Sequence, residues 1–151
     1  MLSYKVSLLG SGDPSILSFQ QVGVLVADDV AARIGLIDDD GSVRRAVARL
    51  LRTYGYSCVS YQSAEAALAD PTFLQMNCII VDIHHGGING FELCDRLDAL
   101  GVHIPHFFIT AHMEYDLADY AGKLGSNLLL IKPFEEDQLI ATIESTMKPI
   151  G

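Results

Sequence analysis

The chain has 151 residues, half of them apolar and 19% charged, which fits one globular domain with a buried core and argues against disorder. Ten Lys and Arg against nineteen Asp and Glu leave a formal charge of −9. That charge argues against a sequence-independent nucleic-acid surface, so an acidic partner is not expected, whereas a basic or metal-bearing partner stays open. No apolar run approaches the ~20 residues of a membrane span. The three scattered cysteines are expected to be reduced core residues.

Residues 1–32 are interpreted as an N-terminal extension of unknown role. Residues 22–27 are compatible with a strand that ends on two aspartates. The segment behind them, residues 30–35, is too short and too rich in glycine for a crossover helix, so this arm is set apart from the rest of the chain.

From residue 33 onward, short apolar runs typical of buried strands alternate with amphipathic helical stripes. Strands are expected at residues 33–37, 56–61, 78–82, 104–109 and 128–131. Helices are expected at residues 43–54, 63–69, 89–100, 114–124 and 135–147. Ser42 is the expected N-cap of the first helix. Five such alternations predict an α/β fold, a doubly wound five-stranded parallel sheet with helices on both faces.

Polar side chains follow four of the expected strands, where the carboxyl ends of a doubly wound sheet share one edge. These residues are Asp38, Asp39, Asp82, Thr110 and Lys132. Three carboxylates brought together repel one another and need a compensating cation. Hard oxygen ligands suit Mg²⁺, or Mn²⁺ in its place. A cation, a lysine and a hydroxyl around one carboxylate can handle a phosphoryl group, with Asp82 as the nucleophile that forms an acyl phosphate.

Four separate motifs carry a resemblance that covers residues 33–148. They are Ile-Asp-Asp-Asp at 37–40, Asp82 with Gly90 eight residues on, Ile-Thr-Ala at 109–111, and Lys-Pro-Phe at 132–134. In order and spacing they resemble the receiver domain of bacterial two-component response regulators. The resemblance implies a flavodoxin-like strand order 2-1-3-4-5, with the first and third strands adjacent at the switch point.

By the same resemblance, Asp82 accepts a phosphoryl group from a histidine kinase or phosphotransfer protein. Asp39 and Asp82 bind Mg²⁺ through their carboxylates, His84 binds it through its backbone carbonyl, and Asp38 acts mainly through water. Thr110 hydrogen-bonds the phosphoryl oxygens.

The resemblance also implies that Lys132 pairs with the phosphoryl oxygens at Asp82. The expected protein is a cytoplasmic signalling switch that catalyses only its own phosphorylation and dephosphorylation. No output domain is expected within these residues, so output is expected through an unknown partner, or the chain is one domain of a longer protein. A homodimer through the face of the last two helices is one option, and no direct contact with nucleic acid or membrane is expected.

Three positions depart from the family pattern and keep two alternatives open. His85 and Gly86 stand where receivers usually have Met-Pro, and Leu129 stands where many have an aromatic switch residue. A degenerate receiver that binds partners without phosphate is the first alternative. A small Mg²⁺-dependent aspartyl phosphatase is the second, although His84 stands where such enzymes typically carry a second acid.

Overall fold

A computed structural model describes residues 31–84, 87–111 and 118–148. The chain divides into a unit of Met1–Ala31 and a unit of Ala32–Gly151, and the second unit holds the α/β fold. The strand expected at residues 22–27, the start of the helix expected at 114–124, and His85 and Gly86 lie outside the described residues. The N-terminal extension therefore stays a prediction.

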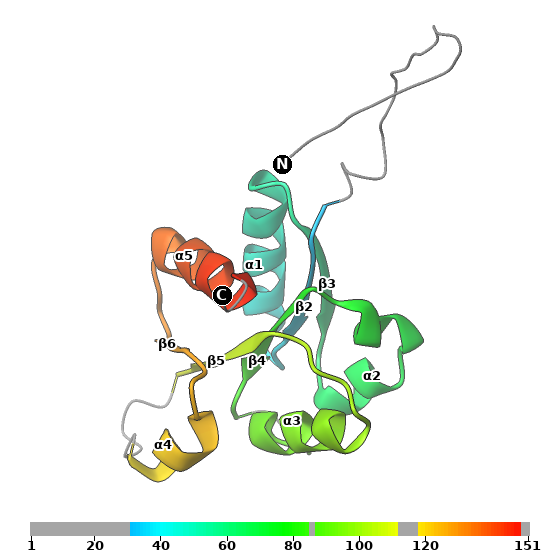
Figure 1. Cartoon of the computed structure of the whole chain (residues 1–151). Coiled ribbons are helices and arrows are strands. Elements are labelled where there is room, and N and C mark those ends of the chain that lie inside the picture. Colours follow the sequence, from blue (N-terminus) through cyan, green and yellow to red (C-terminus); the bar gives the residue numbers. More distant parts are fainter. Residues whose placement is uncertain (1–30, 85–86, 112–117, 149–151) are drawn as a thin grey trace, which may run out of the picture. The chain divides into compact units, whose positions relative to one another are not determined.

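Five parallel strands form one sheet in the order β3-β2-β4-β5-β6 (Figure 1). Their bounds are β2 (Arg33–Ile37), β3 (Ser57–Tyr61), β4 (Cys78–Asp82), β5 (His106–Thr110) and β6 (Leu129–Ile131). Counted in chain order within this unit, the arrangement is 2-1-3-4-5, which confirms the expected fold. All five residues of the central strand β4 are buried, as the continuous apolar run indicates.

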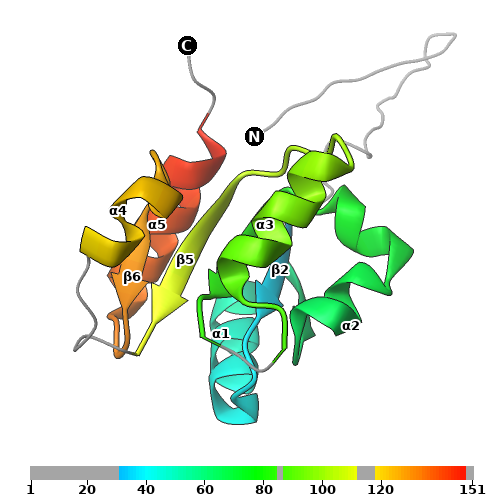
Figure 2. The ribbon, with the colours of Figure 1, turned by 90° about the horizontal axis from the view of Figure 1, so that it is seen from below.

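Helices cover both faces of the sheet (Figure 1). Their bounds are α1 (Gly41–Thr53), α2 (Ala64–Leu68), α3 (Gly90–Ala99), α4 (Ala118–Leu124) and α5 (Glu136–Met147). Figure 2, seen from below, brings α2, α3 and α4 to the front. Except for α4, whose expected start lies outside the described residues, each predicted boundary lies within two residues of the observed one.

Strand β4 divides its side chains between two cores. Cys78 and Ile80 pack with residues of α1 and α5, whereas Ile79 and Val81 pack with residues of α2 and α3. This alternation follows from the two-residue period of a strand. Both faces of the strand are apolar, and only its last residue, Asp82, carries a charge.

The first helix begins differently from the prediction. Asp40, not Ser42, is its N-cap: the Asp40 carboxylate accepts a hydrogen bond from the Ser42 backbone N–H at 2.8 Å, and the helix starts at Gly41. Carboxylates cap as well as hydroxyls, and the run of three aspartates supplied one at the right position. A 3-10 helix at Pro71–Gln75, capped by Asp70, was not predicted.

The three cysteines are free thiols. Only Cys78 is buried, whereas Cys58 and Cys94 are half-buried beside the two cores. Burial raises the pKa of the Cys58 thiol to about 11 and the pKa of Cys78 and of Cys94 to about 12. Within the described part of the chain, no helix is long and apolar enough to cross a membrane.

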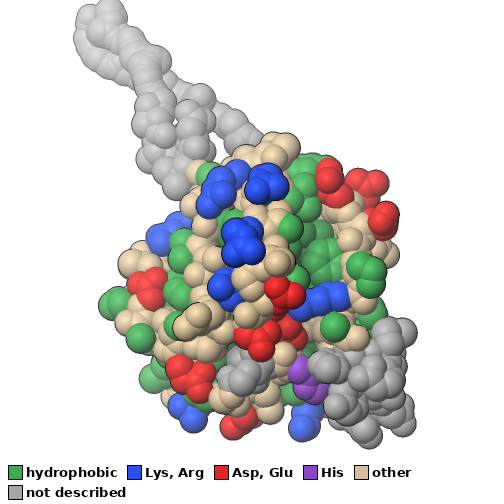
Figure 3. Space-filling view, turned by 180° about the vertical axis from the view of Figure 1, so that it is seen from behind, with side chains coloured by type: hydrophobic (Ala, Val, Ile, Leu, Met, Phe, Trp, Pro, Cys, Tyr) green, Lys and Arg blue, Asp and Glu red, His purple; other side chains and the backbone are tan. Residues whose placement is uncertain are grey.

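Basic side chains gather on one helix, α1, although the net charge of the chain is negative. Seen from behind, Lys and Arg side chains gather in a column over α1 (Figure 3). Arg44, Arg45, Arg49 and Arg52 line a hollow of about 280 Å³ between this helix and Ser60 of β3. Positive side chains are therefore concentrated on α1, although the chain as a whole is acidic.

Candidate functional site

The register of the sheet brings distant charged residues to one edge. Ile37 of β2 pairs with Val81 of β4, so Asp38, which follows β2, lies next to Asp82 at the end of β4. Thr110 of β5 pairs with Ile131 of β6, and Lys132 follows directly. The backbone N–H of Lys132 donates to the Thr110 carbonyl at 2.8 Å, which continues the ladder past the last strand residue.

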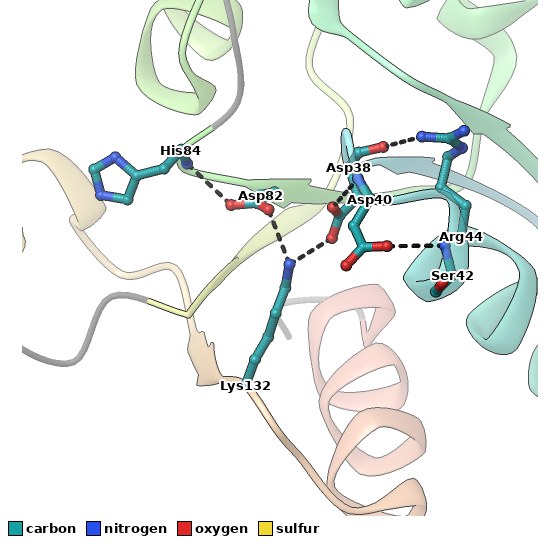
Figure 4. A network of polar contacts seen from close by, with 7 residues as sticks. All are labelled: Asp38, Asp40, Ser42, Arg44, Asp82, His84 and Lys132. Carbon is teal, nitrogen blue, oxygen red and sulfur yellow. Dashed lines mark hydrogen bonds and ion pairs between the residues drawn. The ribbon is translucent and has the colours of Figure 1, made fainter.

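Lys132 joins the two buried carboxylates (Figure 4). Its Nζ donates to Oδ2 of Asp38 at 2.7 Å and to Oδ2 of Asp82 at 2.9 Å. The other oxygen of each carboxylate accepts a backbone N–H, from Asp40 at 2.9 Å and from His84 at 3.0 Å. The two carboxylates thus share the Lys132 ammonium, and each also accepts one backbone N–H of its own.

Asp39 completes a cluster of three acidic side chains. Carboxylate oxygens of Asp38, Asp39 and Asp82 all lie within 4.8 Å of one another. Asp38 and Asp82 are buried, whereas Asp39 is exposed to solvent. One lysine balances only part of the negative charge of three carboxylates.

The comparisons with known proteins agree with this geometry. A family model described as the response regulator receiver domain matches residues 34–144. The chain belongs to the response regulator receiver family. Receivers are signalling domains of two-component systems, and neither the degenerate-binding nor the phosphatase alternative is favoured by the match.

Two curated relatives are similar to this receiver over part of their length. It is 36% identical over 114 residues to the transcriptional regulatory protein FixJ of Azorhizobium caulinodans, covering 76% of this chain and 54% of that protein. It is 32% identical over 128 residues to the response regulator protein TodT of Pseudomonas putida, covering 85% and 56%. The chain thus spans about half the length of the curated relatives it matches.

Solved structures resemble the receiver over most of their length. The crystal structure of FixJ-N matches with a TM-score of 0.68 and 30% identity, covering 80% of this chain and 96% of that chain. A response regulator receiver protein from Burkholderia phymatum matches with a TM-score of 0.66 and 34% identity, covering 77% and 94%.

Burial and neighbouring charges have opposite effects on the pKa values of Asp82 and Lys132. Burial raises the pKa of the Asp82 carboxyl above its usual range and the charge of Asp38 adds to the rise, while the Lys132 ammonium and the His84 N–H oppose it. Burial alone would lower the pKa of Lys132, but its hydrogen bonds to Asp38 and Asp82 outweigh that effect and raise the pKa. Lys132 therefore carries its positive charge at neutral pH, and this charge favours the ionised form of Asp82.

The acidic cluster fits a hard divalent cation. Three carboxylates with converging oxygens are the donor set that Mg²⁺ and Mn²⁺ prefer, and an exposed member such as Asp39 leaves room for the waters that Mg²⁺ retains. An ion at this place would balance the charge that Lys132 leaves uncompensated.

The structure brings most of the predicted site residues together. Asp38, Asp39, Asp82 and Lys132 meet in one cluster, and Thr110 lies fully buried at the end of the strand beside β4. His84 contacts the cluster through its backbone N–H, and its carbonyl remains a metal ligand only as a prediction. The roles of these residues likewise stay predictions.

Sequence reasoning missed one contact at the cluster. Arg44 is not among the predicted site residues, yet its guanidinium donates to the backbone carbonyl of Asp38 at 2.7 Å and ties α1 to the end of β2. The i+6 spacing offered no signal, because it matches no regular helix contact and depends on how the turn between strand and helix folds.

Proposed function

We propose that this receiver is a phosphoacceptor switch in which Asp82 takes a phosphoryl group from the phosphohistidine of a histidine kinase or phosphotransfer protein. The observation that carries the proposal is the double hydrogen bond of Lys132 to Asp38 and Asp82. It supports the proposal because it places a cation beside a buried carboxylate at the edge where parallel sheets bind ligands.

In the proposed reaction, a carboxylate oxygen of Asp82 attacks the phosphorus atom. The P–N bond to the donor imidazole breaks, the imidazole leaves with the electron pair and takes up a proton, and an acyl phosphate forms. Lys132 serves twice: it keeps Asp82 ionised before attack and pairs with a phosphoryl oxygen afterwards. Thr110 would donate its hydroxyl hydrogen to another phosphoryl oxygen.

Asp39 and Asp82 would hold Mg²⁺ through their carboxylates, His84 through its backbone carbonyl, and Asp38 through water, with Mn²⁺ as a substitute. When bound, the cation neutralises charge on the transferring phosphoryl oxygens. Asp38 then has two tasks, since the same carboxylate also orients the Lys132 ammonium.

We assign the receiver to residues 33–148 and the extension to residues 1–32, within a cytoplasmic protein. An unknown output protein would read the phosphorylated state, with a homodimer through the α4–α5 face as one form of output. No direct contact with nucleic acid or membrane is proposed for the receiver itself, and its only reactions are its own phosphorylation and dephosphorylation.

The test is incubation with acetyl phosphate and Mg²⁺, followed by intact-mass measurement. We expect a gain of one phosphoryl group that disappears in Asp82→Asn and when EDTA replaces Mg²⁺. Asp98→Asn, which alters an exposed carboxylate far along α3, is the matched control and should retain the gain. An unmodified wild-type chain, or a gain that persists in Asp82→Asn, would refute the proposal.

A further inference from the structure

Glu65 of α2 reaches the loop that connects β4 to α3. Its Oε2 accepts a hydrogen bond from the backbone N–H of Ile88 at 3.1 Å. The same carboxylate lies against Gly87, where a Cβ would collide with it. Gly87 also has a φ of 79°, in the left-handed region that favours glycine. Glycine at this position therefore permits both the backbone conformation and the close approach of Glu65.

The two ends of this loop are tied to the acceptor strand. At its start, the His84 N–H donates to Oδ1 of Asp82 at 3.0 Å (Figure 4). At its end, Gly90 packs so tightly on β4 that a Cβ would lie 3.2 Å from the Asp82 carbonyl oxygen. Glu65 adds an anchor between these two points. It belongs to α2, which precedes β4 in the chain.

We propose that Glu65 is a positioning residue for the acceptor loop: by holding the backbone at Gly87 and Ile88, it presents the His84 backbone to the cation and phosphoryl group at Asp82. The inference rests on the proposed function of Asp82. A glycine such as Gly87 costs more conformational entropy to order than other residues, and a carboxylate that accepts the neighbouring Ile88 N–H offsets part of that entropy.

The size of the effect follows from the population of ordered loops. Apparent affinity at a site falls by the fraction of molecules in which the site is assembled. Loss of one hydrogen bond to a carboxylate at an exposed position lowers the ratio of ordered to disordered loops about three- to tenfold, and the ordered fraction falls by as much when the ordered loop is the minor state. Glutamine keeps an acceptor oxygen at the same reach, whereas aspartate keeps the charge but shortens the reach by one methylene.

The experiment titrates the full chain with Mg²⁺ alone and follows the amide NMR signals of His84 and Ile88. We expect Glu65→Ala and Glu65→Asp to weaken Mg²⁺ binding about three- to tenfold. Glu65→Gln should stay within about twofold of wild type, because it keeps the acceptor oxygen. In wild type both amides should shift together, whereas in Glu65→Ala the Ile88 signal should no longer follow the metal.

Glu92→Ala is the matched control. Glu92 also accepts one backbone N–H, from Asn89 at 3.2 Å, but it does so in the capping box of α3, beyond the loop. It should leave Mg²⁺ binding within about twofold, since its bond stabilises the helix start. Circular dichroism of each variant verifies that the fold is intact, and Asp and Gln carry the comparison if Ala fails to fold.

Two results would overturn the inference while leaving the proposed function in place. One is wild-type affinity in Glu65→Ala and Glu65→Asp. The other is an equal loss in Glu65→Gln and Glu65→Ala, which would assign the effect to charge and not to hydrogen bonding. If instead the wild-type chain neither binds Mg²⁺ nor accepts a phosphoryl group at Asp82, the proposed function fails and the inference fails with it.

Discussion

Replacing Lys132 with methionine removes the ammonium group between two buried carboxylates and keeps most of the length of the side chain. Asp38 is 0% exposed and Asp82 is 4% exposed, and Lys132 Nζ bonds to both. Without it, each carboxylate keeps one backbone N–H donor and faces a like charge. Breaking a buried ion pair by removing one partner is strongly destabilising for this reason.

The separation of the carboxylates sets the magnitude. Their oxygens lie within 4.8 Å, and two unit charges at that distance repel by about 3.5 kcal/mol at an effective dielectric constant of about 20. We therefore expect Lys132→Met to lower the free energy of unfolding by about 3 kcal/mol at pH 7.5 without Mg²⁺.

The loss should depend on pH with a definite sign. Because burial raises the pKa of Asp82, the folded state binds the proton more tightly than the unfolded state. Stability therefore falls as the pH rises above about 4, where carboxyl groups of the unfolded chain ionise. Removing Lys132 enlarges this fall, so the effect of Lys132→Met should shrink below about 1 kcal/mol near pH 4.

Urea unfolding followed by far-ultraviolet circular dichroism at pH 4 and pH 7.5 measures both values, and this probe suits a chain without tryptophan. Lys148→Met, which alters an exposed lysine at the end of α5, is the control and should stay within about 0.5 kcal/mol of wild type. An equal loss at both pH values would refute the reasoning, since it would indicate lost packing and not an uncovered charge.

Three further predictions use the same unfolding assay. Asp40→Ala should lower the free energy of unfolding by about 1 kcal/mol because it removes the N-cap of α1, whereas Ser42→Ala should stay within about 0.5 kcal/mol; the reverse order would restore Ser42 as the cap. Gly90→Ala should destabilise by about 1–3 kcal/mol because its Cβ would meet Val81 Cγ1 at 3.0 Å, whereas Gly122→Ala, with open space around it, should not destabilise; equal effects would contradict the close approach. Asp82→Asn should stabilise the metal-free chain at pH 7.5, because a carboxyl whose pKa is raised by burial becomes neutral, and the gain should shrink near pH 4; destabilisation at pH 7.5 would contradict that pKa direction.

The sequence alone determined the elements and the edge at which the chemistry is expected. The apolar run at Cys78–Asp82 is a buried strand because both of its faces meet helices, and a run without polar alternation indicates that environment. Asp38, Asp39, Asp82 and Lys132 could be assigned to one edge because strands of a parallel sheet point the same way.

Only the tertiary structure decided which atoms meet at that edge. The bonds of Lys132 to Asp38 and Asp82 span 94 and 50 residues, and the bond of Glu65 to Ile88 spans 23. Such contacts depend on strand register and on the placement of helices over the sheet, and a sequence pattern carries neither quantity. Periodicity reports which face of an element is buried, whereas a hydrogen bond requires the position of two side chains to within a few tenths of an ångström.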